Sequence, residues 1–398
     1  MPEHSEPLVV IGASARWFAA SARRAGWAPY VADLFDDVDL RTAAAATCCV
    51  RECAEGYPHG LVSACRGFPA APFCYVGAVE NHPEIIRAVA ADRPLFGSPP
   101  GAVAAVRDPW ALRRLADAAG FAAPDCRPDP LGLPLDGTYL RKPLAGAGGR
   151  GIVPWDAAPP ATSVASFWQQ RIAGDSWSAA YVISADGGRL LGASRQLTGE
   201  PWCHARPFAY CGSVHVPLDR VPPPLARRLA AVAPLLAAAG LRGAVGIDLV
   251  VDPEGVAWMI EVNPRPTASM ELIELATGES LAAAHVAACG GPAAASPPRP
   301  PTTLRARWAK AVLFAPCDLE LDAAWPTRLA AVQAAWNDRS GLAGIADVPR
   351  AGGRIPAGGP VCTLLAAAPT AAAALALLRK RAAGVLGSFS PPGVAARC

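Results

Sequence analysis

One stretch of the sequence, residues 244–266, reads AVGIDLVVDPEGVAWMIEVNPRP. Two apolar runs flank Pro-Glu-Gly, which is typical of a tight turn, so the stretch predicts a β-hairpin. Because side chains alternate along a strand, Glu261 and Asn263 share one face, and the hairpin register can bring Asp248 beside them. Two carboxylates and an amide oxygen are hard ligands that suit Mg²⁺, with Mn²⁺ as an alternative. The stretch therefore predicts a metal site.

The residue that follows this acidic pair supports the interpretation. Arg265 lies two positions beyond Asn263 on the same side, where its guanidinium is available for a transferring phosphoryl group or an acyl phosphate. The alternative is a hairpin with polar ends and no ligand. Charged groups within apolar strands are costly to bury unpaired, which favours the metal site.

A glycine-rich segment, residues 142–152, reads KPLAGAGGRGI. It is not a P-loop, because the lysine precedes the glycines and no GK[ST] ends them. Backbone N–H groups of such a loop can close over polyphosphate, and a lysine at the end of the preceding strand can place its ammonium there. The alternative is a flexible turn. Lysine occurs only at positions 142, 310 and 380 in an arginine-rich chain, which favours a specific role for Lys142.

The rest of the chain predicts an α/β protein in three parts. The N-terminal part alternates short apolar runs with helical patterns, which predicts a parallel βαβ sheet without a full GxGxxG dinucleotide motif. Helices are expected near 108–120 and 225–239, and strands near 309–314, 345–348 and 361–365. A stretch rich in Pro, Ala and Ser at 291–303 predicts a linker. The predicted domains span 1–100, 101–295 and 304–398.

Composition excludes several functional classes. The net charge of +3 and the lack of a Lys/Arg run argue against a nucleic-acid partner. The N-terminus lacks a signal-peptide layout, and the apolar stretch 364–378 is too short to span a bilayer, so we expect a cytoplasmic protein with no membrane partner. Twelve cysteines without a CxxC pair are expected to be free thiols.

Together, the lysine–glycine loop and the Asp…Glu-x-Asn-x-Arg hairpin resemble the ATP-grasp superfamily. The chain looks most similar to predicted ATP-dependent carboligases at four short stretches, residues 77–83, 106–109, 310–315 and 346–349. The resemblance implies an α/β (α+β grasp) fold. Its parts are an N-terminal parallel-sheet pre-ATP-grasp domain, a two-lobed ATP-grasp domain and a small β-rich C-terminal lobe, ordered as in biotin carboxylases.

The resemblance also implies roles for individual residues in binding ATP and Mg²⁺. Lys142 matches the phosphate-binding lysine, and Asp248, Glu261 and Asn263 match the metal ligands, with Asp248 where many relatives have Glu. Arg265 matches the basic residue after them. The flexible loop matches Gly146, Gly148, Gly149 and Gly151.

Two further assignments rest on the resemblance. Gln169, Gln170 and Ile172 match the interdomain strand whose backbone reads adenine, although Gln replaces the usual Glu. Asp175 is a candidate for the ribose hydroxyls, with a solvated turn acid as the alternative. Arg107 stands where the family often has an earlier lysine, and it could equally cap a surface helix.

Substrate residues are less sharply indicated. Arg195 and Arg206 could clamp an anionic substrate, because a planar guanidinium suits carboxylates, or they could be structural. His204 and His215 could act as general bases, although a hydrogen-bonded structural histidine is commoner.

The function implied is an ATP-dependent carboxylate–amine ligase with an acyl-phosphate intermediate, acting on small-molecule acid and amine substrates. Alternatives are a bicarbonate-activating carboligase that uses carboxyphosphate, and a catalytically silent nucleotide-binding protein. Dimers are common in these families, so a homodimer is one expected assembly.

Overall fold

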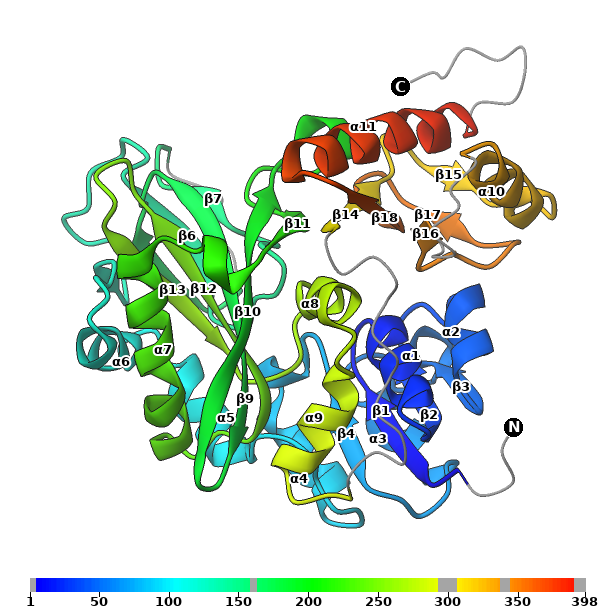
Figure 1. The fold of residues 1–398 in the computed structure, drawn as a ribbon, viewed down its shortest axis with the longest axis horizontal. Coiled ribbons are helices and arrows are strands. Elements are labelled where there is room, and N and C mark those ends of the chain that lie inside the picture. The colour runs from blue at the N-terminus through cyan, green and yellow to red at the C-terminus, as the bar shows by residue number, and fades with distance from the viewer. Residues whose placement is uncertain (1–4, 158–162, 293–305, 337–343, 390–398) are drawn as a thin grey trace.

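A computed structural model describes residues 5–157, 163–292, 306–336 and 344–389. The chain forms a mixed α/β fold, with a parallel sheet near the N-terminus and a large antiparallel sheet after it, which confirms the predicted fold class (Figure 1). No helix within these ranges is both long and apolar enough to cross a bilayer. The predicted linker at 291–303 falls mostly outside the described residues, and the predicted domain boundaries stay predictions.

The N-terminal sheet is parallel, with strand order β3-β2-β1-β4. Its central strand is β1, whose run Leu8–Ile11 is completely buried. Helices α1 and α9 pack together beside this sheet, and α9 also contacts the large sheet. The elements of this part are β1 (Pro7–Ile11), α1 (Arg16–Arg24), β2 (Ala28–Asp33), α2 (Val38–Ala43), β3 (Ala46–Cys49), α3 (Gly60–Arg66), β4 (Phe73–Tyr75), α4 (Pro83–Ala90) and α5 (Pro100–Arg107).

A small antiparallel sheet, β5-β8-β6-β7, follows helix α6. Helix α6 ends where predicted, because Gly120 adopts the left-handed conformation that closes a helix, with φ of 75°. The elements are α6 (Leu112–Ala119), β5 (Cys126–Arg127), β6 (Tyr139–Pro143), β7 (Val153–Pro154) and β8 (Ser166–Gln170).

The large sheet has the order β13-β12-β9-β10-β11-β14-β18-β16. Helix α7 packs its Leu225, Leu229 and Leu236 against one face of it, and α8 and α9 lie between the sheet and the N-terminal part (Figure 1). The central elements are β9 (Asp175–Ser184), β10 (Gly187–Thr198), β11 (Tyr210–Val216), α7 (Pro223–Ala238), β12 (Gly243–Val251), β13 (Ala257–Asn263), α8 (Met270–Thr277) and α9 (Leu281–Ala288).

The C-terminal part is rich in β-structure, as predicted, and its strands continue the large sheet through the β11–β14 pairing. Helix α11 covers β14 and β18 and buries Leu378 and Val385 against them. The elements are β14 (Arg307–Phe314), β15 (Leu319–Glu320), α10 (Trp325–Ala334), β16 (Ile345–Ala346), β17 (Arg354–Ile355), β18 (Pro360–Ala368) and α11 (Ala371–Gly387).

A buried group of charges, the interlobe cluster (Arg16, Glu271, Lys310 and Asp347), joins the three parts. Arg16 on α1 donates to Glu271 on α8, and its Nε donates to Asp347 Oδ1 at 2.8 Å. Lys310 on β14 donates to Glu271 Oε2 at 2.7 Å. Each charge in the cluster therefore has an oppositely charged partner, and the contacts fix the N-terminal part against the other two.

Candidate active site

The hairpin forms with the predicted register. Asp248 on β12 lies directly opposite Glu261 on β13, and Gly246 lies opposite Asn263. Because opposed residues share a face, Asp248, Glu261 and Asn263 point to the same side of the sheet. Asn263 Nδ2 donates to Asp248 Oδ2 at 3.0 Å, and Gln196 Nε2 on β10 donates to Asp248 Oδ1 at 2.8 Å.

The two hairpin carboxylates experience opposite electrostatic environments. Burial, together with the neighbouring charge of Glu261, raises the pKa of Asp248. Burial would also raise the pKa of Glu261, but Arg107 and Lys142 outweigh it and lower that pKa. Two facing carboxylates are thus shifted in opposite directions, with the pKa of Asp248 raised and that of Glu261 lowered.

This arrangement fits a hard divalent cation. Within the described ranges, no three His, Cys, Asp or Glu side chains are grouped to share a metal ion. The hairpin instead offers two carboxylates and one amide oxygen. Mg²⁺ typically takes one or two protein carboxylates and fills its other positions with water and substrate phosphates. The Asn263 amide must present its oxygen to such an ion, which a flip of the amide allows.

Arg107 connects the hairpin to the glycine loop. Its Nη1 lies 3.4 Å from Glu261 Oε2, and its Nη2 donates to the Gly146 carbonyl at 3.1 Å. Asn81 donates to the same carbonyl at 3.2 Å and accepts from Arg107. Of the two sequence interpretations, the contacts agree with a charge supplied to the site rather than a surface helix cap.

Lys142 approaches the hairpin from the small sheet. Its Nζ donates to Gln169 Oε1 at 2.9 Å, and Gln169 Nε2 lies 3.5 Å from the Ile260 carbonyl on β13. Burial lowers the pKa of Lys142, although the charge of Glu261 opposes this effect. The lysine and the acidic hairpin therefore lie within electrostatic range of one another.

The glycine loop is docked against the start of β11. Tyr210 N donates to the Gly148 carbonyl at 3.1 Å. Gly149 has a φ of +77°, and a Cβ added there would lie 1.8 Å from the Phe208 carbonyl oxygen. Only glycine fits this position, both for its backbone conformation and for its space.

Comparison with known proteins agrees with this geometry. The model of the ATP-grasp domain family matches residues 106–269. The chain carries an ATP-grasp domain. The match includes the Arg107, Lys142 and hairpin positions, so all three groups belong to one domain. No curated protein matches the sequence.

Solved structures share the fold over almost the whole chain. Rhizobium etli pyruvate carboxylase superposes with a TM-score of 0.69 at 17% identity and covers 95% of this chain, which spans only 37% of that protein. The biotin carboxylase domain of Hydrogenobacter thermophilus 2-oxoglutarate carboxylase, solved with MgADP and bicarbonate, gives 0.67 at 13% identity, covering 94% of this chain and 89% of its own. Bacillus licheniformis L-amino acid ligase gives 0.63 at 14% identity, covering 95% and 97%. At these identities the likeness establishes the fold alone.

The remaining sequence-predicted residues of the ATP-grasp domain are not all gathered at the hairpin. Asp175, the first residue of β9, forms an ion pair with Arg195 on β10, and both side chains are exposed. The Arg206 guanidinium lies 3.5 Å from the Ala357 carbonyl in the C-terminal part. The roles of these three residues stay predictions.

The strand predicted to read adenine is β8 with the segment that follows it. Gln169 is buried beneath Lys142, Gln170 accepts from Asp125 N at 3.2 Å, and Ile172 lies on the connection from the small sheet to β9. This connection joins the two sheets, and the adenine assignment stays a prediction.

Three contacts were missed by sequence reasoning. Glu80 binds Arg265 Nε at 2.8 Å and holds that guanidinium beside the hairpin. Asn81 and Gln196 contact the glycine loop and Asp248 respectively. Glu80 and Asn81 lie in the quoted stretch 77–83, so a signal was present without a role attached to it.

Proposed function

We propose that this protein is an ATP-dependent carboxylate–amine ligase that forms an acyl-phosphate intermediate. One observation carries the proposal: Arg107 contacts both Glu261 of the acidic hairpin and the carbonyl of Gly146 in the glycine loop. A polyphosphate bound between them would meet lysine, arginine, backbone N–H groups and one metal ion at a single place.

Different residues of the chain would bind the metal ion, the phosphates, the adenine and the ribose. Asp248, Glu261 and Asn263 would hold Mg²⁺, which when bound neutralises phosphate charge. Lys142 and the loop glycines (Gly146, Gly148, Gly149 and Gly151) would bind the phosphates. Gln169, Gln170 and Ile172 would line the adenine side, and Asp175 would contact the ribose.

The reaction proposed has two balanced steps. A substrate carboxylate oxygen attacks the γ-phosphorus of ATP and ADP leaves, which gives the acyl phosphate. The amine nitrogen then attacks the acyl carbon, phosphate leaves, and the nitrogen loses a proton as the amide forms. Arg265, once free of Glu80, would stabilise the phosphoryl charge, and Arg195 or Arg206 would bind the acid.

The proposal is tested by ADP release from Mg²⁺-ATP against pairs of small carboxylic acids and amines. Release that requires both members of one pair, with an amide product of the summed mass less water, is the expected result. Release that never depends on an amine contradicts ligation.

Bicarbonate activation is the second candidate, favoured by the fold shared with a biotin carboxylase domain solved with bicarbonate. It predicts incorporation of labelled bicarbonate without any added acid. A silent nucleotide-binding protein is the third candidate. The facing carboxylates of the hairpin argue against it, because they are costly to retain without a ligand.

A further inference from the structure

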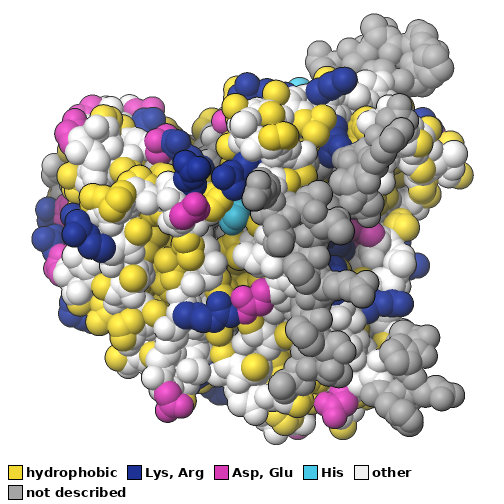
Figure 2. Space-filling model, in the orientation of Figure 1, with side chains coloured by type: hydrophobic (Ala, Val, Ile, Leu, Met, Phe, Trp, Pro, Cys, Tyr) yellow, Lys and Arg dark blue, Asp and Glu magenta, His cyan; other side chains and the backbone are white. Residues whose placement is uncertain are grey.

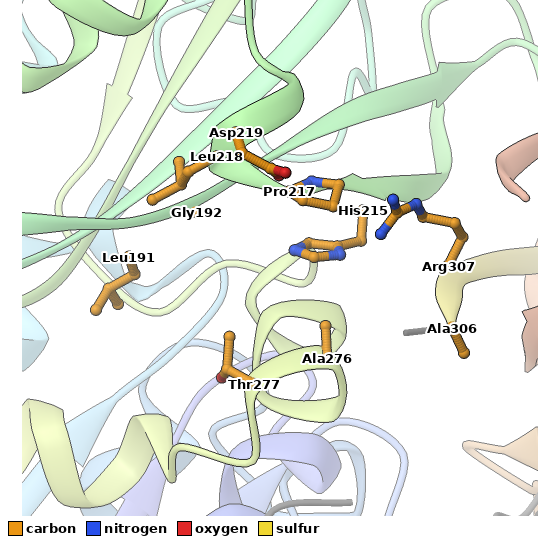
Figure 3. Close-up of a pocket in the computed structure, with 10 residues that line it drawn as sticks. All are labelled: Leu191, Gly192, His215, Pro217, Leu218, Asp219, Ala276, Thr277, Ala306 and Arg307. Carbon is orange, nitrogen blue, oxygen red and sulfur yellow. The ribbon is translucent and has the colours of Figure 1, made fainter. Parts of the chain in front are cut away.

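A pocket lies on the large sheet, away from the hairpin. It has a volume of about 690 Å³, within the range of small-molecule sites. It opens between β10, β11, the end of α8 and the start of β14 (Figure 3). In the space-filling view, basic side chains border the hollow in this part of the molecule (Figure 2). The lining residues are Leu191, Gly192, His215, Pro217, Leu218, Asp219, Ala276, Thr277, Ala306 and Arg307.

His215 is the unusual residue of this pocket. His215 is only 7% exposed, and its buried Nδ1 has no hydrogen-bond partner among the described residues. Buried polar atoms are almost always paired, because an unpaired one loses its hydrogen bonds to water without replacement. The sequence left two roles open for His215, a general base and a hydrogen-bonded structural histidine. The lack of a described partner for its Nδ1 argues against the structural role.

Arg307 supplies a cation beside this histidine. Its guanidinium extends from the start of β14 toward the His215 ring (Figure 3), and within the described parts of the chain it has no side-chain hydrogen bond or ion pair. Burial and the charge of Arg307 together lower the pKa of His215 to about 4, so the ring is neutral at pH 7. The pocket therefore presents a guanidinium with no partner among the described residues and a neutral imidazole that can donate a hydrogen bond.

The other walls define the ligand class. Leu191, Pro217, Leu218 and Ala276 supply apolar surface. Among the described residues that line the pocket the one acid is Asp219, whose side chain is 77% exposed, so solvent screens its charge. A small molecule with one anionic end and an apolar body matches these walls.

The pocket is distinct from the hairpin site. His215 lies opposite Ser194, Ser194 opposite Ser178, and Ser178 opposite Asp248, so the four residues share one face of the sheet. Three strand spacings separate His215 from Asp248, or about 14 Å. Ser178 and Ser194 between them are buried, and Ser178 lies 3.4 Å from the Ser269 hydroxyl, which covers this part of the face.

We propose that this pocket is a second ligand site that binds a small organic carboxylate, with Arg307 as the ionic partner and His215 as a hydrogen-bond donor. Helix α8 connects the two sites. Its N-terminal end lies a few residues after β13, the second strand of the hairpin, and its C-terminal residues Ala276 and Thr277 line the pocket. The occupant is too far from the hairpin for its carboxylate to be the group that is activated there.

The proposal is tested by calorimetric titration of the full chain with hexanoate and with hexanamide, its neutral counterpart. We expect saturable binding of hexanoate only. Arg307→Gln should weaken it by about tenfold to a hundredfold, because a charge-assisted hydrogen bond is lost, and His215→Gln should weaken it less. Arg113→Gln, on an exposed α6 residue, should bind as the wild type does. Thermal unfolding of each variant confirms that it is folded.

A second readout separates the pocket from the hairpin. In histidine ¹³Cε1 NMR spectra, the signal that disappears in His215→Gln should shift when hexanoate is added. Asp248→Asn should retain hexanoate binding while losing Mg²⁺-nucleotide binding, so failure of the proposed ligase activity leaves this test intact. Equal binding of hexanamide, loss of binding in Asp248→Asn, or no saturable binding of any linear carboxylate from butanoate to octanoate overturns the proposal.

Discussion

The interlobe cluster and the hairpin contain similar charged residues in opposite states of balance. In the interlobe cluster, Arg16 and Lys310 outweigh the effect of burial and lower the pKa of Glu271. In the hairpin, Asp248 and Glu261 face each other, and the pKa of Asp248 is raised. Every charge of the first arrangement has an oppositely charged partner, whereas Asp248 in the second has only the amides of Gln196 and Asn263 among its described hydrogen-bond partners. This difference separates a structural ion-pair network from a candidate catalytic site.

The largest expected effect is on the interlobe cluster. Arg16→Gln should lower the free energy of unfolding by about 3–5 kcal/mol, because Glu271 and Asp347 lose a buried partner. Thermal and urea unfolding measure it. Arg24→Gln is the matched control, since the Arg24 side chain is 50% exposed in its pair with Glu274. It should cost no more than about 1 kcal/mol. Equal losses of unfolding free energy in the two variants would show that the interlobe network stabilises the fold no more than an exposed ion pair does.

The second effect concerns the hairpin. Glu261→Gln should lower Mg²⁺-dependent ATP turnover by at least about a hundredfold, because one metal-binding carboxylate is lost from the transition-state environment. Its thermal stability should remain near that of wild type, since repulsion with Asp248 is also removed. Glu254→Gln, in the exposed turn of the same hairpin, is the control and should turn over normally. Unchanged turnover in Glu261→Gln contradicts the site assignment.

The hairpin was predictable from sequence because its signals are local. Alternation placed Glu261 and Asn263 on one face, and the turn at 253–255 set the register that brought Asp248 opposite Glu261. Lys142 and the loop glycines were likewise marked by adjacent residues.

The interlobe cluster was not predictable, because its partners lie far apart in the chain. Arg16 and Asp347 are 331 positions apart, and no periodicity links them. Lys310 stood out only as a rare lysine, and its contact with Glu271 depends on the packing of α8 against β14. For the same reason, Glu80 could not be assigned to Arg265, and the continuation of the large sheet through β11 and β14 could not be anticipated.

The third effect is on the glycine loop beside the hairpin. Gly149→Ala should weaken binding of Mg²⁺ and a non-hydrolysable ATP analogue by about tenfold, because an L side chain is strained at this φ and would also clash with Phe208. Gly148→Ala has a similar φ of +60° but open space around it, so it isolates the backbone strain and should have a smaller effect. Equal dissociation constants for the two variants would mean that docking against Phe208 does not contribute to nucleotide binding.

The smallest expected effect comes from a buried carboxyl group beside the interlobe cluster. Its pKa is raised, whereas the pKa of Glu271 within the cluster is lowered. Asp37 is 4% exposed. Burial and the charges of Asp347, Asp33 and Asp39 raise its pKa to about 9, against the opposing charge of Arg16. Its unfolded pKa is near 3.8, so between that value and about pH 9 the unfolded chain has lost this proton and folding must take it up again. This carboxyl therefore destabilises the fold progressively between about pH 4 and pH 9, the opposite sign to Glu271.

Asp37→Asn tests this sign. The variant should match wild type near pH 4 and exceed its free energy of unfolding by at least about 1 kcal/mol at pH 8, because an amide cannot ionise. Asp219→Asn, on an exposed carboxyl, controls for the general loss of one negative charge and should show no such trend. A stability difference that stays constant from pH 4 to pH 8 would mean that Asp37 ionises normally. The interlobe region would then contain balancing charge that its ion pairs do not reveal, and its contrast with the hairpin would weaken accordingly.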